Sequence, residues 1–121
     1  MLSTGVDLIE VDRIRGAIER QGVRFLKRIY TTKELALCGD NMPSLAGRFA
    51  AKEAVSKALG TGIGDVEWTD IEVLRGLNKE PVLHLHGAAI KVAKKKKFKQ
   101  WSISISHTHE HAIALVVAMT K

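Results

Sequence analysis

The chain has 121 residues, of which 45% are hydrophobic and 26% are charged. This composition is typical of one globular domain over residues 1–121 and excludes a disordered chain, and the longest apolar run, Ala112 to Met119, is too short to span a bilayer. Because 19 Lys and Arg exceed 13 Asp and Glu, the net charge of +6 favours an anionic partner: a nucleic acid, a phosphorylated ligand or an acidic protein. The single cysteine, Cys38, permits no internal disulfide and fits a cytoplasmic location.

The first predicted element is a strand over Leu2–Ile9, with Val6 and Leu8 on one face. Gly5 and Asp7 interrupt its apolar pattern. A carboxylate near the end of an apolar strand is unusual, because burial without a partner is costly. Asp7 therefore faces solvent, caps the next helix or serves as a metal ligand.

Residues 10–28 show apolar side chains at helical spacing, interrupted by Gly22. They contain six basic side chains and three acidic ones. If the helix continues through Gly22, four arginines form one stripe, which is either a solvated face or a docking surface for an acidic helix. These residues are Arg13, Arg20, Arg24 and Arg28.

A central helix is predicted next. Thr31 and Glu34 form a capping-box pattern that begins a short helix ending at Cys38, and a loop over residues 38–43 follows it. Ser44 is the expected N-cap of the long central helix, and Gly60 is its expected C-terminal stop.

The central helix divides into two arcs at 100° per residue. One arc is mostly alanine, which predicts close packing against a sheet. The other arc is either a solvated face or a site, and it contains Arg48, Lys52, Glu53, Ser56 and Lys57 together with Phe49.

The remaining segments predict an antiparallel sheet packed on this helix, which makes the fold class α+β. After the glycine-rich turn at 60–64, strands are expected at Asp70–Leu74 and Val82–His86, a helix from Ala88 to about Lys97, and further strands at Trp101–Ile105 and Ala112–Ala118.

Three histidines, His107, His109 and His111, lie in the turn between the last two strands. Alternate histidines can share a face and bind Zn or Ni, but no thiolate is near them in the sequence. A single functional His107, next to Ser106 at the strand end, is the simpler interpretation.

Taken together, four motifs in this order resemble the short bacterial holo-[acyl-carrier-protein] synthases, which are small trimeric 4'-phosphopantetheinyl transferases. The resemblance covers nearly the whole chain, and the N-terminal Gly-x-Asp combined with Phe-x-x-Lys-Glu-Ala-x-x-x-Lys is its most specific part. The motifs are Gly5-Val6-Asp7, the stretch from Arg48 to Ala58, Gly60-Thr61-Gly62-Ile63-Gly64, and Ile103-Ser104-Ile105-Ser106-His107-Thr108.

This resemblance implies a fold and a reaction. The 4'-phosphopantetheine arm of coenzyme A would be transferred to a serine of apo acyl carrier protein for fatty acid biosynthesis, releasing adenosine 3',5'-bisphosphate. Asp7 and Glu53 would coordinate Mg²⁺, and Glu53 or a metal-bound water would accept the serine proton. The resemblance further implies a homotrimer with sites between subunits, and the arginine stripe as the docking surface for the acidic carrier protein.

The catalytic residues implied by the resemblance are Glu53, Lys57 and His107. The residues that it implies for coenzyme A binding are Arg48, Lys57, Gly60, Gly62, Ser106 and His107.

Two features depart from the family pattern. The segment from Cys38 to Ala46 contains no Lys or Arg, so contacts to the 3'-phosphate of coenzyme A must come from elsewhere. Glu80 precedes Pro81 where Gly-Lys-Pro is expected, which bears on structure alone.

Two other functions remain as alternatives to a transferase. A basic nucleic-acid-binding domain is disfavoured because one Tyr, three Phe and two Trp provide little stacking surface. A histidine-based metal-binding protein is the other alternative. The resemblance therefore predicts a carrier protein and coenzyme A as partners, with no nucleic acid and no membrane.

Overall fold

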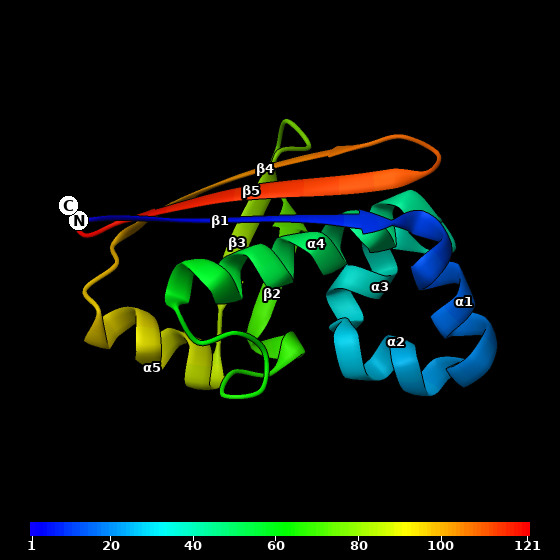
Figure 1. Cartoon of the computed structure of the whole chain (residues 1–121), viewed down its shortest axis with the longest axis horizontal. Coiled ribbons are helices and arrows are strands. Elements are labelled where there is room, and N and C mark those ends of the chain that lie inside the picture. Colours follow the sequence, from blue (N-terminus) through cyan, green and yellow to red (C-terminus); the bar gives the residue numbers. More distant parts are fainter.

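The computed structural model describes residues 1–121 and is organised around one helix, α4 (Met42–Leu59). This helix runs along one face of a three-stranded antiparallel sheet of β1 (Leu2–Glu10), β5 (His111–Met119) and β4 (Gln100–His107), in the order β1-β5-β4 (Figure 1). The predicted α+β class, with an antiparallel sheet on an alanine-rich helix, is confirmed. The buried face of β5 consists of small side chains: Ala112, Ala114, Val116 and Ala118.

Helix α4 begins earlier than the sequence predicted. The Asn41 side chain is its N-cap and accepts a hydrogen bond from the Ser44 amide at 3.0 Å, so the prediction that Ser44 is the cap was wrong. Pro43 fits in the first turn because no backbone N–H is needed there. Gly60 ends the helix as predicted, in the left-handed conformation with φ of 82°.

A second layer covers the face of α4 opposite the sheet. It consists of the hairpin β2 (Ile71–Arg75) and β3 (Pro81–Leu85), α3 (Thr32–Cys38) and the short 3₁₀ helix η1 (Trp68–Asp70). As a result, 13 of the 18 residues of α4 are buried. Of the two interpretations of the polar arc, the solvated face is wrong for Arg48, Lys52 and Ser56, which are buried. Arg48 and Lys52 donate hydrogen bonds to groups of this second layer.

The predicted helix over residues 10–28 is two helices, α1 (Val11–Gln21) and α2 (Val23–Ile29). Gly22, with φ of 59° and ψ of −135°, leaves the helical conformation and redirects the chain. The four arginines consequently do not form one stripe: Arg13 and Arg20 lie on α1, and Arg24 and Arg28 lie on α2. The capping box of α3 is present as predicted, between Thr31 and Glu34.

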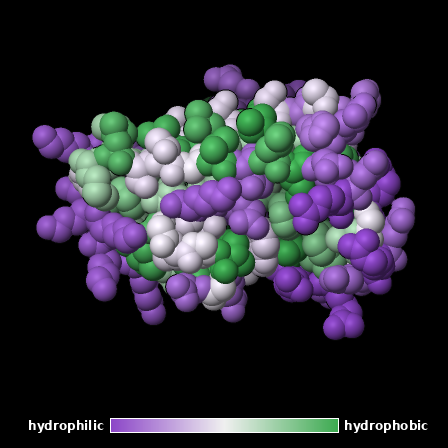
Figure 2. Space-filling model, viewed as in Figure 1, coloured by the Kyte–Doolittle hydropathy of each residue, from purple (hydrophilic) through white to green (hydrophobic).

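The other face of the three-stranded sheet has no layer over it. The helices lie to one side of this sheet, including α5 (Gly87–Lys95) beneath the chain termini (Figure 1). Hydrophobic side chains gather in Figure 2 along the side where Figure 1 places the strands. The exposed large hydrophobic residues of β1 and β5 are Leu2, Val6, Leu8, Ile113 and Leu115, with exposed fractions between 41% and 64%.

None of the helices combines the length and the apolar character needed to cross a membrane.

Candidate active site

Asp7, Glu53 and Lys57, which we call the carboxylate cluster, meet at the β1 edge of the sheet. Lys57 Nζ lies 3.3 Å from Asp7 Oδ1 and donates a hydrogen bond to the Val6 carbonyl oxygen at 2.9 Å. Glu53 and Lys57 are one turn apart on α4, so they share a helix face. Asp7 caps no helix, since α1 has no side-chain cap. The structure thus brings together the three residues that the sequence motifs singled out.

The carboxylates of Asp7 and Glu53 repel each other, and a divalent cation bound between them would relieve this repulsion. Burial raises the pKa of Glu53, the nearby Asp7 carboxylate raises it further, and Lys57 lowers it in part. Two half-buried carboxylates with one ammonium group fit Mg²⁺, which binds one or two carboxylates and takes its other ligands from water and substrate phosphate. No cluster of three His, Cys, Asp or Glu side chains exists in the structure, so neither a protein cage nor the three-histidine site is supported.

The raised pKa of Glu53 gives a testable stability effect in metal-free protein. A carboxyl whose pKa is higher in the folded state favours folding at low pH, and this contribution is lost as pH rises through the folded pKa. We therefore expect Glu53→Gln to raise the thermal unfolding temperature in EDTA at neutral pH, with a gain that shrinks as pH falls. Scanning fluorimetry measures this effect, and exposed Glu19→Gln is the control. A lower unfolding temperature for Glu53→Gln at neutral pH would contradict the assignment.

A second cluster, which we call the basic pocket, lies at the β4 edge. Its volume is about 180 Å³, and its charged or titratable lining residues are Arg48, Arg75, Lys79 and His107. Arg48 is buried and held in place, because Nε donates to the Val73 carbonyl oxygen and a terminal nitrogen donates to Ser44 Oγ, both at 3.0 Å. This concentration of cations suits a phosphate group.

Sequence reasoning missed Arg75 and Lys79 as possible site residues. They lie at the end of β2 and in the hairpin turn, more than 25 positions after Arg48, and only the fold brings them to the pocket. They add two cations to this pocket, whereas the segment from Cys38 to Ala46 contains none. Their one sequence signal is that both basic residues lie within the predicted connection of a hairpin.

The carboxylate cluster and the basic pocket lie at opposite edges of the same sheet. Strand order places β1 at one edge and β4 at the other, with α4 packed between them. Asp7 pairs with Ala114 on β5, which pairs in turn with Ile105 on β4. One chain therefore carries two separate candidate sites, which we call half-sites.

The other residues implied for coenzyme A contribute less directly. Ser106 is on the outward face of β4, away from the basic pocket that Ile105 and His107 line. The amides of Gly60 and Gly62 both donate to the Ser56 carbonyl oxygen, so they close the end of α4 instead of pointing to solvent. A side chain at Gly62 would contact nothing within 4 Å, which leaves room there for a ligand.

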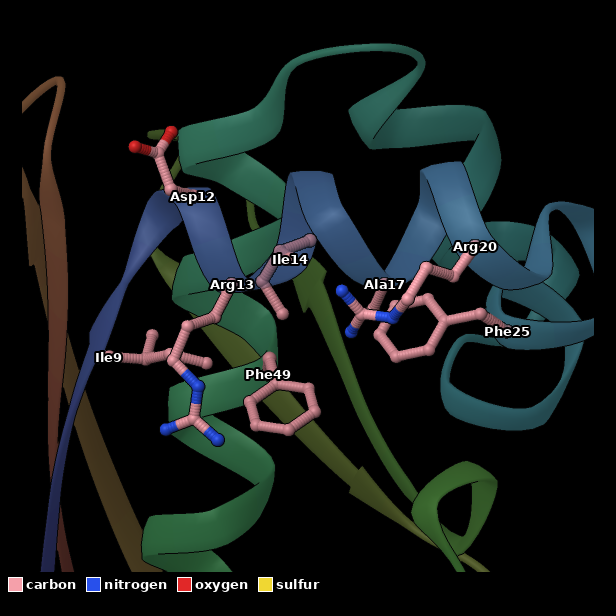
Figure 3. Close-up of a pocket in the computed structure, with 8 residues that line it drawn as sticks. All are labelled: Ile9, Asp12, Arg13, Ile14, Ala17, Arg20, Phe25 and Phe49. Atoms are coloured by element: carbon pink, nitrogen blue, oxygen red, sulfur yellow. The ribbon is translucent and has the colours of Figure 1, made fainter.

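A third feature is a cavity of about 490 Å³ beside α1, which we call the α1 pocket (Figure 3). Arg13 and Arg20 stand on either side of Phe49 from α4, while Asp12 points away (Figure 3). The apolar lining comes from β1, α1, α2 and α4, and it consists of Ile9, Ile14, Ala17, Phe25 and Phe49.

The two arginines of α2 are not part of the α1 pocket. Arg28 lines a separate groove with Lys27 and Trp68, and Arg24 is exposed on α2. The predicted arginine surface is therefore divided in two at Gly22.

Comparisons with known proteins agree on one family. The family model described as the 4'-phosphopantetheinyl transferase superfamily matches residues 3–116. A holo-[acyl-carrier-protein] synthase of Herpetosiphon aurantiacus is 48% identical over 126 residues, covering 98% of this chain and 99% of that relative. One from Dehalococcoides mccartyi is 50% identical over 118 residues, covering 98% of each chain.

Solved structures agree with the sequence relatives. The crystal structure of Helicobacter pylori holo-[acyl-carrier-protein] synthase in complex with coenzyme A has a TM-score of 0.88 to this chain at 35% identity, covering 96% of this chain and 99% of that one. The Bacillus anthracis synthase, also solved in complex with coenzyme A, has a TM-score of 0.78 at 37% identity, covering 96% and 94%. By family model, sequence and fold alike, this chain belongs to the 4'-phosphopantetheinyl transferase superfamily.

Proposed function

We propose that this chain is a Mg²⁺-dependent holo-[acyl-carrier-protein] synthase. It transfers the 4'-phosphopantetheine group from coenzyme A to a serine of apo acyl carrier protein and releases adenosine 3',5'-bisphosphate, in the cytoplasm, for fatty acid biosynthesis. The observation that carries this proposal is the carboxylate cluster, in which Asp7, Glu53 and Lys57 meet at one edge of the sheet.

Each residue of the cluster has a role in this reaction. Asp7 and Glu53 would hold Mg²⁺, which when bound polarises the attacked phosphate and stabilises the leaving group. Lys57 lies within reach of Asp7 and balances the negative charge that a pyrophosphate brings to the cluster. The Lys57 ammonium is fixed by the Val6 carbonyl oxygen, so it needs little reorganisation when substrate binds.

The basic pocket would hold the nucleotide end of coenzyme A. Its arginine, lysine and histidine side chains suit the 3'-phosphate, because the one cation of the carboxylate cluster, Lys57, is assigned to the pyrophosphate. Because the pocket and the cluster lie at opposite edges, one bound coenzyme A would take the cluster from one subunit and the basic pocket from its neighbour.

A homotrimer would supply that neighbour. The uncovered sheet face carries Leu2, Val6, Leu8, Ile113 and Leu115, and an apolar surface of this kind is characteristic of a subunit interface. Cyclic symmetry would repeat the same pairing of β1 edge and β4 edge at every interface.

The test of the proposed function is mass spectrometry of apo carrier protein after incubation with coenzyme A and Mg²⁺. The proposal requires a mass increase of one phosphopantetheine arm that EDTA abolishes. An unchanged carrier protein, together with tight salt-dependent binding to DNA or RNA, would favour the nucleic-acid-binding alternative.

Subunit sharing predicts which inactive variants restore each other. Asp7→Ala and His107→Ala chains, mixed at random in one trimer, should recover activity, since about a quarter of the sites would receive both native residues. Asp7→Ala mixed with Glu53→Ala should recover none, because the two carboxylates lie near each other in one chain and would serve the same proposed site. Transfer rates of co-expressed pairs measure this, with light scattering as the check on oligomeric state. Recovery in the second pair, or an active monomer, would contradict the shared site.

The α1 pocket is the proposed docking site for the acidic carrier protein. Arg13 and Arg20 form no ion pair within the chain, so both are available to a partner's carboxylates. The apolar lining beneath them offers a place for a hydrophobic side chain of the partner. Arg24 and Arg28 lie on α2, outside the α1 pocket, and would form a second basic surface beside it.

Charge reversal in the α1 pocket should weaken docking selectively. We expect Arg20→Glu to raise KM for the carrier protein about tenfold, equivalent to about 1.4 kcal/mol, and to leave KM for coenzyme A nearly unchanged. Added salt should weaken docking of the wild type in the same way, since exposed charges are screened over about 10 Å at 0.1 M.

The matched control is Lys95→Glu on α5, which makes the same charge change at the other end of the molecule (Figure 1). Equal increases of KM in Arg20→Glu and Lys95→Glu would assign the effect to net charge and would contradict docking at the α1 pocket.

A further inference from the structure

Strand β1 lies very close to the backbone of α4 at Gly5. A Cβ atom at Gly5 would lie 2.8 Å from the Ala54 carbonyl carbon and closer still to its oxygen, which no real side chain tolerates against backbone. Asp7 is two residues further along the same face of β1, and Glu53 is the residue before Ala54. The separation of Asp7 from Glu53 is thus fixed at this contact.

A second close approach occurs at the other edge of the sheet. A Cβ atom at Gly47 would lie 2.9 Å from Ile105 Cγ2. This methyl group is bonded directly to Cβ of a β-branched residue, so it cannot swing aside as a long side chain could. Gly47 precedes Arg48, and Ile105 is two residues before His107 on the same strand face, so this contact fixes one wall of the basic pocket.

Neither glycine is required by its backbone conformation. The residues with positive φ in this chain do not include Gly5 or Gly47. An alanine at either position would have an allowed backbone, and only the space between strand and helix excludes its methyl group. Space alone therefore accounts for glycine at both positions.

We propose that Gly5 and Gly47 are positioning residues, one for each half-site: Gly5 sets the spacing of the Asp7–Glu53 pair, and Gly47 sets the basic pocket around Arg48 and His107. This inference rests on the proposed function for its substrates, and on the close contacts of the two glycines for its geometry. Each glycine acts only through the charged residues beside it, so the two substitutions should have different functional effects.

The experiment compares Gly5→Ala and Gly47→Ala by two readouts. The first is Mn²⁺ binding at a saturating concentration of coenzyme A, followed by electron paramagnetic resonance without turnover. The second is the ratio of kcat/KM for coenzyme A to that for 3'-dephospho-coenzyme A, which reports contacts to the 3'-phosphate.

Gly5→Ala should weaken Mn²⁺ binding about ten- to a hundredfold and leave the preference for the 3'-phosphate unchanged. Gly47→Ala should reduce that preference and leave Mn²⁺ binding unchanged. The matched control is Val116→Ala, since Val116 pairs with Gly5 across β1 and β5 and is buried. It loosens the same core without pushing β1 away from α4, so it should change neither readout.

A rescue variant separates positioning from general damage. If the methyl group added by Gly5→Ala moves β1 outward, the longer side chain of Asp7→Glu should restore Mn²⁺ binding in that background. The same Asp7→Glu change alone should weaken binding in the wild type.

Equal effects of both alanine variants on both readouts, or no rescue, would overturn the proposal. A Gly5→Ala chain that does not fold would also overturn it for that position, and Gly47→Ala would then decide the other. Failure of the proposed function is a different result: wild-type protein would transfer no phosphopantetheine, or would not distinguish the two coenzymes.

Discussion

Replacing either carboxylate of the Asp7–Glu53 pair with alanine is expected to lower the rate of phosphopantetheine transfer about a thousandfold or more. Such a loss corresponds to about 4 kcal/mol of transition-state stabilisation, which is of the size that a bound metal ion contributes. Each variant leaves one carboxylate beside Lys57. The ammonium group of Lys57 neutralises this remaining carboxylate, so the cluster is no longer suited to a divalent cation. Transfer to apo carrier protein, measured at limiting Mg²⁺ by mass spectrometry, gives the rates.

The control for this prediction is Asp40→Ala, which removes an exposed carboxylate away from the cluster. It should retain normal turnover. Circular dichroism should show native folding for the Asp7 and Glu53 variants, because neither side chain is part of the buried core. Near-normal turnover of either alanine variant at limiting Mg²⁺ would contradict the assignment of the carboxylate cluster.

Much of this architecture was predictable because local sequence signals act over a few residues. Alternating apolar residues defined β1 and β4, the capping box defined the start of α3, and Gly60 defined the end of α4. The family resemblance, carried by Gly5-Val6-Asp7 and the stretch from Arg48 to Ala58, is confirmed by the family model and by close relatives. Asp7 and Glu53 could be paired from the sequence only through that resemblance, since 45 residues separate them.

The sequence-based predictions were wrong where a second layer of structure buries a helix face, and where the chain changes direction between two helices. Helical periodicity assumes one buried face, so it left the arc with Lys52 and Ser56 as either a solvated face or a site. Both side chains are buried, and Lys52 donates hydrogen bonds to groups of α3 and β2. The arginine stripe failed at Gly22, where the backbone conformation ends α1. No local pattern records that Arg75 and Lys79 reach the same pocket as Arg48.

The two half-sites lie at opposite edges of one sheet, but the same helix, α4, positions residues of both. Helix α4 carries Glu53 and Lys57 toward β1 and carries Arg48 toward β2 and β4, so a single rigid element positions residues of both. A displacement of the whole of α4 would therefore alter two different active sites of the proposed trimer at once, whereas a local change at one sheet edge would alter one. The buried interactions that hold α4 against the second layer are consequently of direct functional interest.

The most deeply buried ion pair among these interactions is that between Lys52 and Glu34. Both side chains are fully buried, and Lys52 Nζ lies 2.8 Å from Glu34 Oε1. Lys52 also donates to the carbonyl oxygens of Trp68, at 3.0 Å, and Ile71. The Glu34 carboxylate accepts hydrogen bonds from the backbone amides of Thr31 and Val73, both at 2.9 Å. Burial lowers the pKa of Lys52, and the Glu34 charge opposes this effect.

Lys52→Met should therefore reduce the free energy of unfolding by about 3–5 kcal/mol, because it leaves the Glu34 charge buried without its cation. Urea denaturation at a fixed protein concentration measures the loss, and concentration must be fixed because the proposed oligomer couples assembly to folding. Lys33→Met is the control, since this exposed lysine on the same helix as Glu34 should change stability by less than about 0.5 kcal/mol.

The double variant Lys52→Met with Glu34→Gln distinguishes a charge effect from lost packing. It removes both buried charges and keeps an amide oxygen for one backbone donor, so its stability should exceed the value expected from adding the two single losses. If the losses simply add, Lys52 and Glu34 do not stabilise each other, and the effect of Lys52→Met belongs to packing around α4. If the double variant recovers as expected, the buried cation is what joins α3, η1 and β2 to the helix that carries both half-sites.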